Sequence, residues 1–132
     1  MNSKEVNEME NERKSPLTDQ SMDFAVRIVN LYKYLRDSKY ETVISKQLLR
    51  SGTSIGANVR EGSYAQSKAD FRTKMNIALK EANETDYWIE LLYKTEYISE
   101  NEYKSLKEDC RSLLRMLIST VKKTSEPKSQ LL

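Results

Sequence analysis

The stretch QLLRSGTSIGANVREG, residues 47–62, decides how the rest of the chain is interpreted. Its large apolar and small residues recur at spacings of 4, 3, 4 and 3, the pattern of a helix that packs along one face: Leu48, Gly52, Ile55, Val59 and Gly62. An interior glycine weakens a helix by roughly 0.5–1 kcal/mol relative to alanine, so Gly52 and Gly56 need a structural reason. The simplest is close packing against a neighbouring backbone, within the chain or between subunits. The alternative is a loop over residues 51–58 between two shorter helices.

Length and composition point to one helical domain. The chain has 132 residues, of which 38% are hydrophobic and 32% charged, with only three glycines and two prolines to form turns. A single cysteine, Cys110, excludes an intrachain disulfide, and its helical spacing predicts a buried thiol in a reducing compartment. No signal peptide and no run of 18 apolar residues is found, so we expect a soluble, cytoplasmic protein.

The rest of the chain divides into an arm, four helices and a tail. Residues 1–15 are polar and aperiodic and are expected to be a disordered arm, and residues 125–132 a loose tail. Between them, residues 16–124 should form the folded domain. The first helix is expected at about 17–36, and the second from near Glu41 to 62–64. Capping boxes at 67–70 and 99–102 mark the starts of the third and fourth helices.

Apolar stripes give each helix one buried face. The first carries Phe24, Ile28, Leu31 and Leu35; the third carries Phe71, Met75, Ala78, Ala82, Thr85, Ile89 and Leu92; the fourth carries Tyr103, Leu106, Cys110, Leu113 and Leu117. Four helices joined by short links predict an all-α, antiparallel up-down-up-down four-helix bundle.

The run RSGTSIGANVREG at 50–62, with DFRTKMNIALKEANETDYWIELL at 70–92, resembles the four-helix-bundle family described from intervening sequences within 23S rRNA genes. The match covers roughly residues 22–122. A related group is the accessory variability protein of diversity-generating retroelements. The resemblance implies a ring-like homo-oligomer, a pentamer, as the assembly. It also implies that RNA or DNA and a reverse transcriptase are potential partners.

Catalytic chemistry finds little support in the sequence. There is no histidine, so the commonest general base and transition-metal ligand are both missing. Di-iron bundles use Glu-x-x-His, whereas this chain offers only Glu81-Ala82-Asn83-Glu84. No phosphate-binding loop of the G-x-x-x-x-G-K type occurs. We therefore expect no enzymatic activity, no metal and no cofactor.

Polar residues form a track beside the seam of the second helix. Arg50, Ser54, Asn58 and Glu61 follow one another at 4, 4 and 3, and Glu81 and Glu84 share one sector of the third helix. They could line a ligand pocket, or they could form a structural network in which Arg50 pairs with Glu81 or Glu84. The pattern favours the structural network, which would fix helix register or a subunit contact.

Charge is unevenly distributed between the two ends of the expected bundle. One end collects ten cations against six carboxylates: Arg13, Lys14, Arg60, Lys68, Arg72, Lys74, Arg115, Lys122, Lys123 and Lys128 against Glu12, Asp19, Asp23, Glu61, Asp70 and Glu126. The opposite end is neutral. A ring of five would concentrate about 20 excess positive charges, enough to attract phosphates without reading sequence. We expect a non-enzymatic accessory protein that binds nucleic acid through this end; the alternative is a protein–protein scaffold that docks partners on exposed Tyr and Trp residues.

Overall fold

The computed structural model describes residues 2–4 and 15–125, and four long helices fill most of this range. They are α2 (Pro16–Ser38), α3 (Ile44–Ser63), α4 (Lys68–Lys94) and α5 (Glu100–Lys123). The described residues contain no β-strand. The expected arm at 1–15 and tail at 125–132 lie largely outside these residues. The predicted all-α four-helix bundle is confirmed.

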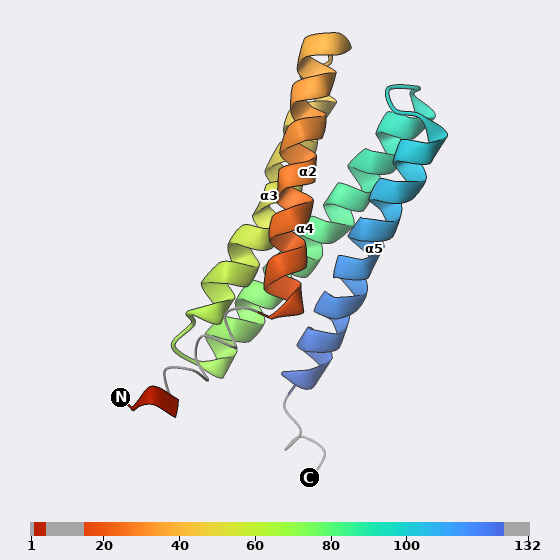
Figure 1. Cartoon of the computed structure of the whole chain (residues 1–132). Helices are drawn as coiled ribbons and strands as arrows, with labels where there is room; N and C mark the ends of the chain where they lie inside the picture. The colour runs from red at the N-terminus through yellow and green to blue at the C-terminus, as the bar shows by residue number, and fades with distance from the viewer. Residues whose placement is uncertain (1, 5–14, 126–132) are drawn as a thin grey trace.

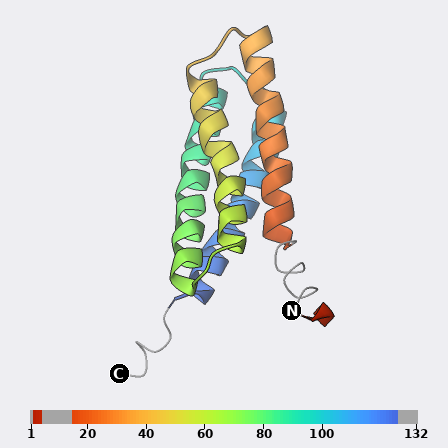
Figure 2. The same cartoon turned by 90° about the vertical axis from the view of Figure 1, so that its left-hand side faces the viewer.

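The helices stand side by side with their connections at alternating ends. The α2–α3 and α4–α5 connections lie at the upper end in Figure 1, and the α3–α4 connection lies at the lower end. Figure 2 shows the same arrangement after a quarter turn. α3 packs on both α2 and α4, and α4 on both α3 and α5, whereas the contact between α2 and α5 is sparser than any of these. The bundle therefore has a continuous α2–α3–α4–α5 series of contacts and one weak seam.

The predicted apolar stripes form the core. Fully buried side chains come from every helix and include Ile28, Leu35, Leu48, Ile55, Met75, Ile89, Leu92, Leu106, Leu113 and Leu117. Phe71 and Tyr103, which head the third and fourth stripes, are only partly buried because they lie within the first turn of their helices. No helix in the described part of the chain combines the length and apolarity needed to cross a membrane.

Three of the four helices begin at a serine that caps them. The hydroxyls of Ser15, Ser67 and Ser99 accept hydrogen bonds from backbone amides three residues later, at 3.2, 3.1 and 3.2 Å. Such caps satisfy amides that lack a partner within the helix. The predicted capping roles of Ser67 and Ser99 are confirmed.

α3 begins later than expected, and its first amides are satisfied by a glutamate. The helix starts at Ile44, although the sequence suggested a start near Glu41. The Glu41 carboxylate accepts from the amides of Ile44 and Ser45, each at 3.1 Å, and the Ser45 hydroxyl donates to the Glu41 carbonyl at 2.8 Å. Glu41 is buried, so these bonds replace its hydration.

The glycine-bearing stretch is helical throughout, so the loop alternative for 51–58 is wrong. Gly52 lies against α2: a methyl group there would lie 2.9 Å from two side-chain carbons of Ile28. A methyl group at Gly56 would lie 3.3 Å from the carbonyl oxygen of Ser21. Both glycines therefore allow α2 and α3 of the same chain to approach closely.

Candidate functional site

Arg50 joins α3 to α4 through two carboxylates. Its Nη1 lies 3.1 Å from Oε2 of Glu81, and its Nη2 forms an ion pair with Glu84. The same Glu84 oxygen accepts a hydrogen bond from the Trp88 indole nitrogen at 3.2 Å. The Arg50 side chain is 50% exposed, so this pair lies at the surface and not inside the bundle. Exposed ion pairs contribute little to stability, typically below about 1 kcal/mol, and here the geometry mainly fixes the register of the two helices.

The remaining α3 residues of the predicted polar track bond to groups other than the Arg50 guanidinium. Ser54 donates to the carbonyl of Arg50 at 2.6 Å, and Asn58 donates to the carbonyl of Ser54 at 2.8 Å, so both return to their own helix. Glu61 pairs with Lys74 of α4 at 2.9 Å. The track therefore consists of two separate ion-pair groups between α3 and α4, one at Arg50 and one at Glu61. The side chains between them, Ser54 and Asn58, bond to carbonyls of their own helix.

A buried polar contact that the sequence reading missed lies behind this surface. The hydroxyls of Ser51 and Thr85 share a hydrogen bond of 2.9 Å between α3 and α4, and both residues are completely buried. Thr85 also lies 2.7 Å from the carbonyl of Glu81. The available signal was that Thr85 belongs to the apolar stripe of its helix and that Ser51 lies three residues after Leu48 and four before Ile55. These positions predict burial but not pairing.

Lys107 of α5 makes a second contact that the sequence did not reveal, and this one is an ion pair. It is 9% exposed, and its ammonium lies 3.1 Å from Asp86 and 3.6 Å from Glu90 on α4. Burial alone would lower the pKa of Lys107, but the hydrogen bond to Asp86 and the nearby carboxylates outweigh burial and raise it. The cation is therefore retained as a fixed link between α4 and α5.

Cys110 is buried one turn further along α5. Its thiol lies 3.4 Å from the carbonyl of Ala82. Burial raises the pKa of Cys110 to about 12, so the thiol stays protonated at neutral pH. Among the residues with described positions, no group of three or more potential metal ligands occurs.

The seven cations predicted to contact nucleic acid come from α3, α4 and α5, whose segments near the α3–α4 connection and the end of α5 lie toward the lower end in Figure 1. They are Arg60 of α3, Lys68, Arg72 and Lys74 of α4, and Arg115, Lys122 and Lys123 of α5. We call these seven residues the basic end. Arg72 and Lys74 are partly buried, and the other five are exposed.

The basic end keeps an excess of positive charge. Its seven cations face four carboxylates in the described structure, those of Asp19, Asp23, Glu61 and Asp70. Among ion pairs that join two described residues, only Lys74–Glu61 engages any of these carboxylates. Arg60, Lys68, Arg115, Lys122 and Lys123 have no ion pair with any residue that the structure describes. Arg13, Lys14 and Lys128, together with Glu12 and Glu126, lie outside the described residues.

Residues 13–119 match the 23S rRNA-intervening sequence protein family. The chain belongs to this family. A solved family structure from Bacteroides thetaiotaomicron, described as a protein of unknown function from the S23 ribosomal protein family, is 59% identical with a TM-score of 0.79. The alignment covers 80% of this chain and 98% of that chain. Among curated proteins, none matches this sequence.

Proposed function

We propose that the protein is a non-enzymatic, cytoplasmic accessory factor that binds structured RNA or DNA through the basic end. The observation that carries this proposal is the set of five exposed cations without an ion pair among the described residues, Arg60, Lys68, Arg115, Lys122 and Lys123. Such cations are free to replace the counterions of a phosphate backbone. By contrast, three cations further along the helices, Arg27, Arg50 and Lys107, are already paired with carboxylates.

Assembly would strengthen this binding. In the proposal, an antiparallel up-down-up-down bundle forms a ring of five, so that an excess of three charges per chain becomes about 15 on one face. A patch around Met22 and Val26 on α2 supports a subunit contact, because these side chains are 45% and 53% exposed. Met22 and the small α3 residues Gly56 and Ala57 line a cavity of about 390 Å³ beside this patch. Val26→Asp should reduce the mass measured by light scattering without changing the helix content.

A salt series of electrophoretic shifts with structured RNA tests nucleic-acid binding. The quadruple variant Arg60→Gln, Lys68→Gln, Lys122→Gln and Lys123→Gln should bind more weakly, equally for unrelated sequences, and with a flatter dependence on salt. The matched control is Lys33→Gln, Lys46→Gln, Lys80→Gln and Lys94→Gln, which removes four charges away from the basic end. Equal losses in both variants, or unchanged binding in the first, would exclude the basic end as the site.

A relationship to the retroelement accessory proteins makes a reverse transcriptase the protein partner to test. If a reverse transcriptase co-purifies with the protein, and the same quadruple variant reduces this co-purification, the result would support a shared nucleic-acid complex.

A scaffold function is the second candidate, favoured by the 87%, 58% and 56% exposure of Tyr40, Tyr64 and Tyr87. Trp88 is partly buried and bonded to Glu84, so the tyrosines are the better docking residues. Partner binding that persists at high salt would favour the scaffold.

A further inference from the structure

A cavity of about 780 Å³ opens between the C-terminal half of α2 and the α4–α5 connection, away from the basic end. Its apolar floor is made by the buried side chains of Leu31 and Ile98. Three tyrosines, Tyr34, Tyr93 and Tyr97, contribute to its walls. This size lies within the roughly 300–1,000 Å³ that is usual for small-molecule sites, which also combine apolar walls with a few polar groups.

The cavity lies on the weak seam between α2 and α5. Polar links cross this seam: Arg27 pairs with Asp109 at 2.8 Å, and Gln20 accepts from Ser112 at 3.1 Å. Arg27 also lies 3.4 Å from Glu102 at the edge of the cavity. Between this ion pair and the α4–α5 connection, the cavity takes the place of a packed α2–α5 interface.

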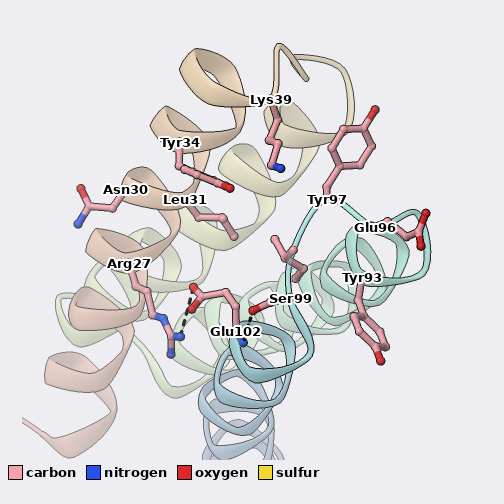
Figure 3. Close-up of a pocket in the computed structure, with 11 residues that line it drawn as sticks. Arg27, Asn30, Leu31, Tyr34, Lys39, Tyr93, Glu96, Tyr97, Ser99 and Glu102 are labelled. Carbon is pink, nitrogen blue, oxygen red and sulfur yellow. Dashed lines mark hydrogen bonds and ion pairs between the residues drawn. The ribbon is translucent and has the colours of Figure 1, made fainter.

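Two hydrogen-bond donors point into this space. Figure 3 shows the Lys39 ammonium and the Tyr34 hydroxyl directed into it, while the side chain of Glu96 points away. Neither Lys39 nor Tyr34 has a side-chain hydrogen bond or ion pair with a residue in the described ranges 2–4 and 15–125. The nearby carboxylate of Glu102 is already engaged by Arg27. Lys39 therefore has no carboxylate paired with it among the described residues that line the cavity.

We propose that this cavity binds a small organic acid. Its carboxylate or phosphate would accept hydrogen bonds from Lys39 and Tyr34, and its apolar or aromatic body would lie on Leu31 and Ile98 beside Tyr97. A cationic ligand is disfavoured because Lys39 already places a positive charge in the space. An inorganic anion alone would leave the apolar floor uncovered, so the organic part contributes to binding.

Titration of the full chain with four probes, followed by heteronuclear NMR, tests this site. The probes are phenyl phosphate, benzoate, inorganic phosphate and benzyl alcohol. We expect saturable binding of at least one aromatic acid, with shifts at Leu31, Ile98 and Tyr97, and weaker binding of inorganic phosphate and benzyl alcohol. Lys39→Gln should weaken that binding about tenfold, because a charge-assisted hydrogen bond is lost. Tyr34→Phe should cause a smaller loss.

Lys33→Gln is the matched control, because Lys33 is an exposed α2 lysine that does not line the cavity. It should bind the aromatic acid like the parent, and all variants should melt at the parent temperature. Absence of saturable binding by both aromatic acids, or equal losses in Lys39→Gln and Lys33→Gln, would overturn the site. Inorganic phosphate binding as tightly as phenyl phosphate would overturn the assignment of an organic ligand.

Discussion

The hydroxyls of Thr85 and Ser51 meet at 2.9 Å between α3 and α4, in a position with no exposure to solvent. Thr85→Val keeps the shape of the side chain but leaves Ser51 with only a 3.4 Å contact to the carbonyl of Leu48. Because an unsatisfied buried hydroxyl is costly, we expect a loss of about 1–2 kcal/mol in the free energy of unfolding. Urea unfolding measures this loss.

A double variant makes this prediction specific. Combining Thr85→Val with Ser51→Ala removes both hydroxyls, so it should cost less than the sum of the two single variants. Thr73→Val is the control, since Thr73 is exposed and bonded only to its own helix. Simple additivity of the two buried variants would show that the hydroxyls do not stabilise each other.

Close packing at Gly52 predicts that alanine destabilises the protein there. Alanine favours the helix by roughly 0.5–1 kcal/mol, but its methyl group would meet Ile28, which is fully buried. Overpacking typically costs about 1–3 kcal/mol, and more with leucine, so thermal melts of Gly52→Ala and Gly52→Leu should shift downward. Because Ile28 belongs to the same chain, the loss should appear as unfolding and not merely as subunit dissociation.

Removing the obstructing side chain provides the control for Gly52. In an Ile28→Ala background, Gly52→Ala should become neutral or stabilising, because the two carbons at 2.9 Å are gone and the Cβ that remains lies 3.3 Å away. A downward shift of the same size in both backgrounds would show that Ile28 is not the cause.

Tyr40 and Glu96 have positive backbone φ angles, 55° and 67°, at the points where the chain leaves α2 and α4. This left-handed conformation costs roughly 1–2 kcal/mol for most L-residues and is normally occupied by glycine. Glycine would relieve this cost at either position, although its greater freedom in the unfolded chain offsets part of the gain. We therefore expect Tyr40→Gly and Glu96→Gly each to raise the free energy of unfolding by about 0.5–1 kcal/mol. Thermal melts measure this gain. Tyr87→Gly, an exposed tyrosine inside α4, should instead destabilise by about 1 kcal/mol.

The raised pKa of Cys110 predicts a loss of stability at alkaline pH. The thiol ionises at 9.0 in the reference state but at about 12 when folded, so the unfolded chain releases its proton first. The contribution of the buried thiol to the free energy of unfolding is therefore fully present below pH 9. It is lost between pH 9 and 12, by up to about 1.4 kcal/mol per pH unit. Other groups titrate in this window, so the measurement is the difference in slope between the parent and Cys110→Ala. Parallel curves for the two proteins would contradict the prediction.

The helices could be predicted from sequence because their signals are local. Ser67 and Ser99 lie three residues before the amides that they cap, and the apolar seams need only the helical repeat. The start of α3 depends on a buried glutamate instead of a usual capping residue, so the pattern near Glu41 placed it too early. Glutamate at this position is read as an exposed surface residue when only composition is considered.

Side-chain pairing was harder to predict because it depends on rotation and distance between helices. The positions of these residues along their helices were enough to suggest that Arg50 pairs with Glu81 or Glu84, and the structure brings all three together. It was not enough to show that this group is exposed, or that Lys107 is buried. Nor does a helical repeat reveal an unfilled space, so nothing in the sequence indicated the cavity near Lys39.

The unequal contacts between helices also have a consequence for amide hydrogen exchange. α3 and α4 each pack on two neighbours, whereas α2 and α5 meet only along a seam held by polar links such as that between Arg27 and Asp109. Separation of α2 from α5 breaks fewer helix–helix contacts than separation of any other adjacent pair, so partial openings should begin there. Deuterium should therefore enter the outer helices first, and the slowest amides should cluster in the central pair, close to Ser51 and Thr85.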